Sequence, residues 1–547
     1  MTATRQADDA GPRNPPGEWV TARPYGPRGW LLVLTAADTA TAARQVHPLA
    51  RHLEHCRPEG LREIIPAFDR ILLDFETPAN AASFRRHWES TRPPHPTDAS
   101  TADLTGTRGR PSDESCRGPV EIAVHFDGLD RAQVARQVGL SEEAVIDAFC
   151  ASPYRVQCLG FSPGFPYLTG LPARLAVPRH ATPRARVPAG SVAIGGSHAG
   201  IYPQASPGGW NLLGRTDERL FDPTGTSLDA IFRLHPGDVV RFHRRPAPPD
   251  ATAPAIRFPD IATPSIPSLG VHQVGWGLRV QDLGRPGHRR FGVPAGGAMD
   301  PASAQAANRL LDNPPDAPVL ELCGQGQVLE ALEDLWIGVV GVSSATGRTA
   351  TTRRLRAGER FEVPRGPLGG VWSYVALPGG IAAPRFLGST SALPHGGRHG
   401  GFQPGDRIAR MESPPMTWPG AVAGRFLPVE PLDPTPIRLW PGLQWDDFPE
   451  RARAAFLATP WTVSSQSDRV GYRLHGPPLV VPSGSALSEP VLAGSVQVPP
   501  EGLPIVTMPD GPTLGGYPKL GLVDPDDLPR LAQHPPGRAV RFVLHAG

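Results

Sequence analysis

The sequence predicts a mainly β protein, with two related barrel-type domains in tandem behind a small α/β domain. Three observations favour this fold class. Glycine and proline, 61 and 68 of 547 residues, make up roughly a quarter of the chain, which favours short strands and turns over long helices. Hydrophobic residues reach 39%, enough for buried cores, and the length suits several domains. The third observation is an internal echo.

The echo consists of three short motifs that occur in the same order in both halves. AGSV, GxYP and PGxxVRF occupy residues 189–192, 200–203 and 236–242, and again residues 493–496, 515–518 and 536–542. Because the same three motifs recur in the same order, the sequence predicts two copies of one strand-rich domain. Closure of each sheet into a barrel would remove its exposed strand edges.

The first part of the chain reads as a tail, a domain and a linker. Residues 1–27 are polar and rich in proline and glycine, so we expect a flexible tail. Residues 28–95 mix apolar strand patterns with helical spacing and are predicted to form the small α/β domain. Residues 96–118 contain almost nothing apolar and are predicted to be a linker or insertion.

The rest of the chain holds the two barrel-type domains. Residues 119–250 are predicted to form the first, with Ser141 as the N-cap of one of its short helices. Residues 251–268, rich in proline and alanine, are predicted to be a linker. Residues 269–547 are predicted to form the second domain, where Asp300 followed by proline caps a helix.

Composition excludes several classes of function. The formal net charge is +2, which gives no electrostatic footprint for nucleic acid or an anionic membrane. No apolar stretch approaches the ~18 residues of a membrane helix. The five cysteines form no CxxC pair and no apolar leader is evident, so we expect a cytoplasmic protein. The 17 histidines show no ligand spacing, so no tightly bound metal is expected.

Lys519 is the only lysine in the chain. It follows Tyr517-Pro518, so no Walker A motif exists, and lysine chemistry is confined to this residue. A surface lysine without function is the plain alternative.

Two candidate motifs lie in the first barrel-type domain. In GFSPGFPYL, Phe161 and Phe165 flank a Pro-Gly turn and either present aromatic faces to a ligand or fill the core. In GGWNLLGR, two glycines allow close backbone approach beside a tryptophan, and Arg215 offers a planar fork for carboxylate or phosphate. The alternative is a tight turn with a surface arginine.

Two further groups lie in the second half. Asp282 and Arg285 stand in the segment VQDLGRPG, which mixes an acid and a base with glycine turns. The other group surrounds the lysine and contains Arg469, Tyr472, Glu489, Gln497, Asp510 and Tyr517. Asp300 is more simply explained as a helix cap.

At these motifs the chain resembles a known family. GFSPGFPYLTGLP, RVPAGSVAIGG and GIYPQASPGGWNLLGRT look like the B-type subunit of 5-oxoprolinase, or allophanate hydrolase subunit 1. VQDLGRPG, GVPAGGAMDP, SDRVGYRLHGPPL and GGYPK look like the C-type subunit of 5-oxoprolinase, or allophanate hydrolase subunit 2. The chain is similar to a fusion of the two subunits, related to urea amidolyase, over roughly residues 28–547.

The resemblance implies a cyclophilin-like β-barrel in each half. It also implies ATP-dependent cleavage of 5-oxoproline, or a similar small amide, to glutamate, with a separate A-type subunit of 5-oxoprolinase as partner and with ATP and Mg²⁺ as substrate. Two alternatives stay open. One is the carboxyltransferase component of a biotin-dependent urea or amide carboxylase, although the chain has no biotin attachment segment. The other is a non-enzymatic regulator that binds a sensor histidine kinase.

The resemblance supports the motif positions, and the chemistry suggests roles for them. Lys519, Glu489 and Asp282 are predicted to be catalytic, the lysine as an electrostatic stabiliser and the two acids as polar or metal-associated partners. Positioned positive charge suits phosphoryl transfer, so Arg215 and Arg469 are predicted to bind anions. The predicted substrate- or nucleotide-binding residues are Arg215, Gly208, Gly209, Trp210, Phe161, Phe165, Arg285, Arg469, Tyr472, Gln497, Asp510 and Tyr517.

The chain departs from the family pattern at four places, one of which is Val342-Ser343-Ser344-Ala345, where the family has an acidic Thr-Gly-Ala-Asp stretch. His198-Ala199 stands where Gln-Thr is usual, Pro490 where glycine follows the acid, and Pro512 where an amide side chain is usual. These changes predict an altered substrate or weakened catalysis.

Overall fold

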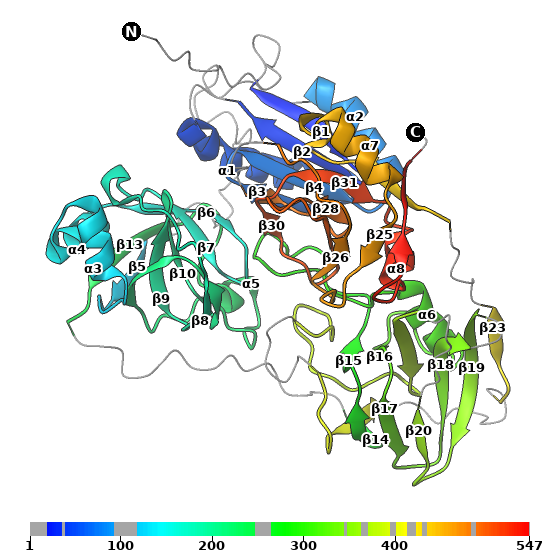
Figure 1. Ribbon diagram of the computed structural model, residues 1–547. Helices are drawn as coiled ribbons and strands as arrows, with labels where there is room; N and C mark the ends of the chain where they lie inside the picture. Colours follow the sequence, from blue (N-terminus) through cyan, green and yellow to red (C-terminus); the bar gives the residue numbers. More distant parts are fainter. Residues whose placement is uncertain are drawn as a thin grey trace. The chain divides into compact units, whose positions relative to one another are not determined.

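The computed structural model describes residues 19–35, 39–91, 118–246, 264–343, 347–362, 370–393, 401–412, 423–428, 435–482 and 488–545. The chain divides into two compact units, residues 1–110 and 111–547, and Figure 1 labels their helices and strands. In the described ranges, no helix combines the length and hydropathy that a bilayer-spanning helix requires.

The first unit is built on a four-stranded antiparallel sheet with the order β1-β2-β4-β3. Its elements are β1 (Val20–Tyr25), β2 (Gly29–Leu34), α1 (Thr39–Cys56), β3 (Leu61–Ala67), β4 (Arg70–Phe75) and α2 (Pro78–Thr91). Sheet and helices bury a common core that includes Trp30, Val46 and Phe84. The small α/β domain is therefore present.

The predicted tail over residues 1–27 is wrong where β1 lies. All six residues of β1 pair with β2, because Trp19 and Val20 bury their side chains in the core of this unit. Residues 1–18 and the predicted linker at 96–118, apart from Gly118, lie outside the described residues.

The first barrel of the second unit is a seven-stranded sheet with the order β12-β9-β10-β7-β6-β13-β5. Its strands are β5 (Val120–Val124), β6 (Tyr154–Leu159), β7 (Pro166–Thr169), β9 (Ser191–Gly195), β10 (His198–Ile201), β12 (Asn211–Arg215) and β13 (Val239–Arg244), with a separate pair β8 (Arg184–Val187) and β11 (Ser206–Gly208). His125 and Arg215 exchange two backbone hydrogen bonds of 2.9 Å, which join the two edge strands and close the sheet.

Helices complete the first barrel. They are α3 (Arg131–Val138), α4 (Glu142–Cys150), the 3-10 turn η3 (Ala173–Leu175) and α5 (Leu228–Ile231). Helices α3 and α4 lie together at one end of the barrel in Figure 1. As predicted, Ser141 caps α4, because its side chain accepts a hydrogen bond from the amide of Ala144.

The segment after the first barrel forms two open sheets. One has the order β20-β17-β14-β22, and the other has the order β15-β16-β21-β18-β19-β23. The elements are β14 (Ser265–Val274), β15 (Gly277–Gln281), α6 (Pro301–Arg309), β16 (Val319–Cys323), β17 (Gln327–Ala331), β18 (Leu335–Ser343), β19 (Gly347–Leu355), β20 (Arg360–Glu362), β21 (Trp372–Ala376), β22 (Arg407–Met411) and β23 (Phe426–Pro428). Asp300 caps α6 through the amide of Ser303, as predicted.

The second barrel is an eight-stranded sheet with the order β32-β25-β26-β29-β28-β31-β24-β33. Its strands are β24 (Ile437–Pro441), β25 (Trp461–Val463), β26 (Gly471–His475), β28 (Ser495–Gln497), β29 (Ile505–Thr507), β31 (Lys519–Val523), β32 (Ala539–Val540) and β33 (Phe542–Leu544), with the separate pair β27 (Glu489–Pro490) and β30 (Leu514–Gly515). Its helices are η6 (Trp445–Asp447), α7 (Glu450–Ala458) and α8 (Leu528–Ala532). Because β32 and β33 end the sheet order but follow each other in the chain, this sheet also closes.

The two barrels have the same topology. Strands β5, β6, β7, β10, β9, β12 and β13 of the first correspond to β24, β25, β26, β29, β28, β31 and the β32–β33 run of the second. In each, the last strand pairs in parallel with the first, β13 with β5 and β33 with β24. The predicted fold class, mainly β with two barrel-type domains, is confirmed.

Two of the three echo motifs occupy equivalent places. Ser191 and Ser495 begin β9 and β28, and PGxxVRF leads into β13 and into β32. The GxYP motif does not. In the first barrel it belongs to β10, whereas residues 515–518 lead into β31, so their true counterparts are residues 208–211, which lead into β12.

Two predicted boundaries also change. Residues 269–547 do not form one barrel, because residues 265–428 build the two open sheets and the barrel strands span residues 437–544. Strand β14 begins inside the predicted linker at 251–268, since its backbone pairs with both β17 and β22. Residues 251–263 lie outside the described residues.

Candidate functional site

Lys519 stands at the start of β31 and is fully buried, with 0% of its side chain exposed. Its ammonium donates to Glu489 Oε1 at 2.9 Å, to the Tyr517 carbonyl at 3.2 Å and to the Gly515 carbonyl at 3.3 Å. A lysine ammonium has three N–H groups. All three are therefore spent on holding an acid and the turn before β31.

Gln444, in the turn after β24, completes this group. Its side-chain oxygen accepts the Lys519 amide at 2.9 Å, and its side-chain nitrogen donates to Glu489 Oε1 at 2.9 Å. Lys519, Glu489 and Gln444 are called the lysine cluster below. Gln444 is not among the residues predicted from the sequence, because a glutamine in a turn carries no motif of its own.

Gln497 and Gly515 pack beside the lysine cluster. Gln497 pairs with Lys519 across β28 and β31, and its side chain donates to the Thr507 hydroxyl at 2.8 Å. A Cβ at position 515 would lie 2.5 Å from Gln497 Oε1. Only glycine fits there without displacing the amide, which explains a glycine in this turn.

In the first barrel, the position equivalent to Lys519 is occupied by Leu212. The hydrogen bond from Lys519 to Gln444 corresponds to one from the Leu212 amide to Asp130 Oδ2 at 2.7 Å. The β-bulge beside Leu212 matches the bulge beside Lys519. Arg184 takes the place of Glu489, because Arg184 pairs with Gly208 and Glu489 pairs with the equivalent Gly515. The Arg184 guanidinium forms an ion pair with Asp130 at 2.5 Å. The first barrel therefore has a base, Arg184, where the second has the acid Glu489, and an acid, Asp130, where the second has Gln444.

Arg469 is the centre of a second buried group. It donates to both oxygens of Asp510 at 2.7 and 2.9 Å, to Glu321 Oε1 at 2.6 Å and to the Gly297 carbonyl at 2.7 Å. Burial alone would lower the pKa of Arg469, but Asp510 and Glu321 raise it above its usual range. Arg469, Asp510 and Glu321 are called the arginine cluster below.

The arginine cluster joins the second barrel to the open sheet that contains β16. Glu321 was missed by the sequence analysis, although a carboxylate in the apolar strand VLELC is a recognisable signal. It is 0% exposed and also accepts hydrogen bonds from the Met299 amide and the Tyr374 hydroxyl.

Asp282 and Arg285 hold a loop of the open-sheet segment. Asp282 accepts hydrogen bonds from the Gly284 amide, the Ser389 hydroxyl and both the amide and hydroxyl of Thr390, at 2.6–3.1 Å. Arg285 is 2% exposed and donates to carbonyls of the same loops. Burial lowers the pKa of Arg285 to about 10, although Asp282 and Asp510 act in the opposite direction.

The aromatic loop of the first barrel divides into a buried and an exposed part. Phe165 is 1% exposed and packs edge-on against Tyr167, Tyr202 and Trp210, so it belongs to the core. Phe161 is 45% exposed with φ of 67°. Its ring is therefore partly exposed at the surface, where a ligand can contact it.

This aromatic loop meets both the second barrel and the open-sheet segment. A Cβ at Gly160 would lie 2.3 Å from the Leu514 side chain, and one at Gly292 would lie 2.5 Å from the Ser162 carbonyl. Leu514 is in β30, which pairs with Glu489 and Pro490 in β27. Motifs from both halves of the chain thus converge near the lysine cluster.

The GGW turn packs into the first barrel, whereas Arg215 lies at its surface. A Cβ at Gly208 would lie 2.3 Å from the Tyr202 hydroxyl, so this glycine makes room for a tyrosine. Gly209 and Trp210 complete the turn into β12, and Trp210 is 5% exposed. Arg215 is 44% exposed in its side chain and pairs with Asp127 at 2.7 Å.

In the described residues, the predicted site residues fall into several groups. The lysine cluster, the arginine cluster and the Asp282 loop are buried and internally bonded. Phe161, Arg215 and Tyr517 keep exposed side chains, Tyr517 at 46%. A cavity of about 570 Å³ is lined by Arg469, Tyr472 and Asp510 but not by the lysine cluster.

The family departures leave one titratable group near the GGW turn. His198 begins β10, and burial, with a smaller effect from Arg179, lowers its pKa to about 4. Pro490 pairs with Leu514 between β27 and β30.

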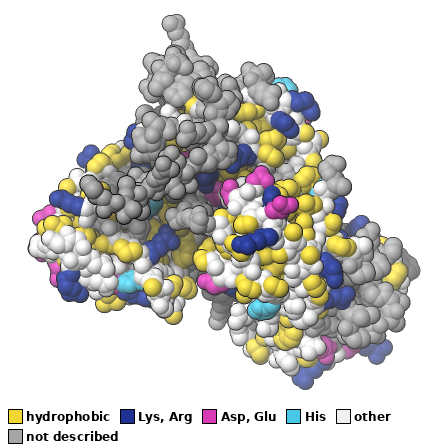
Figure 2. Space-filling model, turned by 45° about the horizontal axis from the view of Figure 1, so that its top comes forward, with side chains coloured by type: hydrophobic (Ala, Val, Ile, Leu, Met, Phe, Trp, Pro, Cys, Tyr) yellow, Lys and Arg dark blue, Asp and Glu magenta, His cyan; other side chains and the backbone are white. Residues whose placement is uncertain are grey.

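In the described part of the chain, no cluster of three or more His, Cys, Asp or Glu side chains is arranged to hold a metal ion. Acidic and basic side chains are interspersed with hydrophobic ones on the face in Figure 2.

Two carboxyltransferase family models match the chain. Subdomains A and B match residues 291–544, and subdomains C and D match residues 20–230. Over 288 residues the chain is 34% identical to the C-type subunit of 5-oxoprolinase from Escherichia coli K12, and the match covers 50% of this chain and 90% of that protein. The chain belongs to the family of 5-oxoprolinase B-type and C-type subunits.

The other 5-oxoprolinase half is also represented. The B-type subunit from Escherichia coli O157:H7 is 51% identical over 126 residues, 22% of this chain and 56% of that protein. The crystal structure of TTHA0988 matches with a TM-score of 0.77 and 35% identity over 94% of this chain and 100% of that one. Urea amidolyase of Lachancea kluyveri is a more distant relative, 28% identical over 300 residues that cover 48% of this chain and 16% of that protein. The chain is thus a fusion of the B-type and C-type proteins.

Proposed function

We propose that this chain supplies, in one polypeptide, the parts of the B-type and C-type subunits in an ATP-dependent 5-oxoprolinase. The observation that carries the proposal is the coverage of 90% of a C-type protein beside a 51% identical match to a B-type protein. The proposed reaction opens the lactam of 5-oxoproline to glutamate. It needs a separate A-type subunit of 5-oxoprolinase and takes place in the cytoplasm, with ATP and Mg²⁺ as substrate.

The chemistry explains why ATP is spent. A lactam amide is stabilised by resonance, so its carbonyl carbon resists attack by water. Phosphoryl transfer to the carbonyl oxygen makes that carbon electrophilic, and such transfer depends mainly on positioned charge. The exposed residues Phe161, Arg215 and Tyr517 are proposed to contact substrate or nucleotide, since each presents nearly half of its side chain.

The buried groups are proposed to act through what they hold. Lys519 and Glu489 are proposed as a positioning pair, because the lysine ammonium binds both the acid and the turn that carries Tyr517. The four hydrogen bonds that Asp282 accepts support a positioning role for its loop. The saturated geometry of Arg469 supports a structural role rather than direct anion binding.

The test combines the purified chain with an A-type partner protein encoded in the same genome, 5-oxoproline, ATP and Mg²⁺. We expect ADP and glutamate in equal amounts, and neither product when either protein is omitted. Folded protein that releases no glutamate with this partner would reject the proposal. Lys519→Met and Arg215→Ala then test the site, and unchanged rates in both variants would reject the residue assignments.

A second candidate function is carboxyl transfer to a small amide. The carboxyltransferase models and the relationship to urea amidolyase favour it. The same protein would be supplied with a carboxylated biotin carrier and urea. Transfer of labelled carboxylate to urea, without glutamate formation in the first assay, would replace the 5-oxoprolinase proposal.

A further inference from the structure

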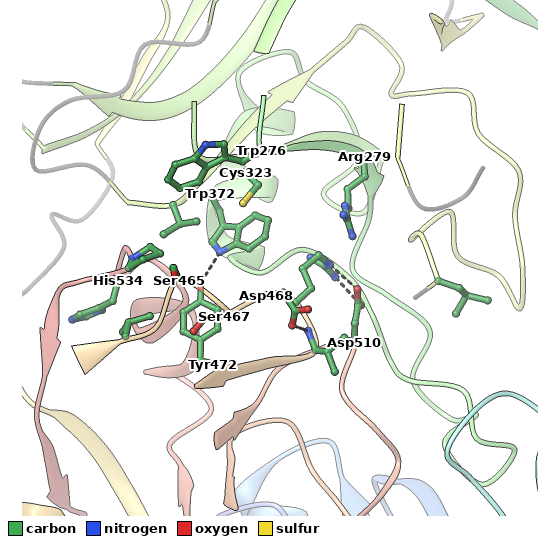
Figure 3. A pocket seen from close by; sticks show the side chains of 16 residues that line it. Trp276, Arg279, Cys323, Trp372, Ser465, Ser467, Asp468, Tyr472, Asp510 and His534 are labelled. Atoms are coloured by element: carbon green, nitrogen blue, oxygen red, sulfur yellow. Dashed lines mark hydrogen bonds and ion pairs between the residues drawn. The ribbon is translucent and has the colours of Figure 1, made fainter. Parts of the chain in front are cut away.

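The cavity of about 570 Å³ lies where the second barrel meets the open-sheet segment. One wall comes from β15, β16 and β21, and the other comes from the segments around β25, β26 and α8. Figure 3 shows Trp276, Cys323 and Trp372 grouped together, with Arg279 to one side and His534 at the opposite end. Its volume is in the range of small-molecule sites. The lysine cluster contributes no side chain to it.

Two indoles, Trp276 and Trp372, form part of this wall. Trp276 is 59% exposed, yet it rests on the backbone of Gly324, where a Cβ would lie 2.4 Å from the indole. Trp372 is 5% exposed and donates from Nε1 to the Tyr472 hydroxyl at 3.2 Å. That hydroxyl donates to the Ala532 carbonyl at 2.6 Å. Pre-positioned aromatic faces favour a flat ligand, since little side-chain entropy is lost on binding.

The lining charges leave one cation available. Arg469 is bonded to Asp510 and Glu321, as described above, and Asp468 Oδ1 accepts the amides of Val470 and Gly471. Arg279, a cavity residue in β15, pairs with Glu321 through its backbone, but its side chain forms no ion pair or hydrogen bond with any described residue. A guanidinium of this kind suits a carboxylate.

His534 adds a neutral polar group at the far end of the cavity. Burial lowers its pKa, although the Arg530 carbonyl at 2.9 Å from Nδ1 acts in the opposite direction. A neutral imidazole does not attract a second anionic group. A polyphosphate therefore finds too few cations here, whereas the Arg279 guanidinium can pair with the single carboxylate of a ligand whose flat apolar body suits the walls.

We propose that this cavity binds a planar aromatic monocarboxylate, with its ring against Trp276 and Trp372 and its carboxylate on Arg279. The site is separate from the lysine cluster and does not depend on the proposed function. A ligand of about a dozen non-hydrogen atoms binds such a site with a Kd of about 0.1–1 mM.

Isothermal titration of the full chain with 2-naphthoate tests the proposal. We expect Trp276→Ala to weaken binding about fivefold, and Arg279→Gln to weaken it about tenfold. Arg279→Lys should fall between wild type and Arg279→Gln. The neutral analogue 2-naphthylmethanol should bind wild type and Arg279→Gln within about twofold of each other. Arg354→Gln, at an exposed arginine paired with Asp334, is the matched control and should bind 2-naphthoate as wild type does.

Three outcomes would overturn the proposal. One is the absence of binding at about 5 mM 2-naphthoate, several times the expected Kd. Another is 2-naphthoate affinity that neither Trp276→Ala nor Arg279→Gln changes, or that Arg279→Gln alone leaves unchanged. The third is ATP that binds more tightly than 2-naphthoate with the same dependence on both residues. Thermal melting of each variant, compared with wild type, shows that it is folded.

Discussion

At the position of Lys519, the two barrels of one chain carry a lysine and a leucine on the same backbone. The equivalent Leu212 makes the same amide hydrogen bond. The backbone itself therefore does not require a lysine. The lysine is explained by its partner, because Glu489 is 1% exposed in its side chain and a buried carboxylate needs a counter-charge.

Replacement of Lys519 by leucine tests this explanation. Lys519→Leu leaves Glu489 without its cation and should lower the free energy of unfolding by about 3–5 kcal/mol. Lys519→Leu combined with Glu489→Gln removes both charges and should recover more than half of that loss. Urea denaturation followed by tryptophan fluorescence measures both. A double variant no more stable than the single one would contradict this account.

His198 predicts a pH dependence of stability. Its folded pKa of about 4 lies below the usual histidine value of 6.5, so the unfolded chain binds the proton more readily. Its contribution is therefore fully present above pH 6.5 and is lost as pH falls towards 4. From pH 7 to pH 5 this loss is up to about 2 kcal/mol.

The measurement compares urea midpoints of wild type and His198→Gln at pH 7 and pH 5. Other groups also titrate in this window, so the difference between the two proteins isolates the histidine. The variant should lose less stability than wild type on acidification. Equal losses in both would show that His198 is not protonated on unfolding.

At the scale of elements, buried charges connect strands that the sequence separates widely. Arg469, before β26, binds Glu321 in β16 and the Gly297 carbonyl before α6. These contacts fix the second barrel against the open sheet that contains β16. The nearby cavity depends on this connection, since Arg469 and Asp510 are among its lining residues.

Arg469→Met tests the connection between the second barrel and the open sheet that contains β16. The change leaves Asp510 and Glu321 buried without their cation and should destabilise the fold by about 3–5 kcal/mol. Thermal unfolding monitored by circular dichroism measures the effect. Arg473→Met, at an exposed arginine of β26, is the control and should change stability by less than about 0.5 kcal/mol. Similar melting of the two variants would show that the arginine cluster contributes little.

At the scale of the whole second unit, the first barrel packs against both the open-sheet segment and the second barrel. Phe291 and Phe386 of the open-sheet segment belong to the core of the first barrel, and Gly160 lies against Leu514 of the second. The Gly164 amide also donates to the Phe291 carbonyl at 2.9 Å. Residues 111–547 form one compact unit for this reason.

The contact between Gly160 and Leu514 can be tested by a suppressor pair. Gly160→Ala places a methyl group 2.3 Å from the Leu514 side chain and should destabilise the protein by about 1–3 kcal/mol. Leu514→Ala creates the needed space, so the double variant should be more stable than the sum of the two single effects. Additive losses in urea denaturation would show that the two residues do not touch.

The sequence predicted the fold class, because strand runs and turns repeat in the same order in both halves. It misplaced β1, since Trp19-Val20 adjoins a tail rich in proline and glycine. It also matched the wrong GxYP motifs, because letters agree where strand pairing does not. For the candidate site, motifs singled out Lys519 and Glu489. They could not show that both are buried, nor find Gln444 and Glu321, because only tertiary contacts give these residues partners.

Closure of each barrel by its last strand bears on the order of folding during synthesis. The strand at 239–244 reaches its partner at 120–124 long before residues 437–544 have been made. The first barrel can therefore assemble on the ribosome, although Phe291 and Phe386 join its core only later. The second must wait for residues 539–544. Until then its edge strands stay unpaired, and the growing chain is open to mispairing with the finished barrel or with a neighbouring copy.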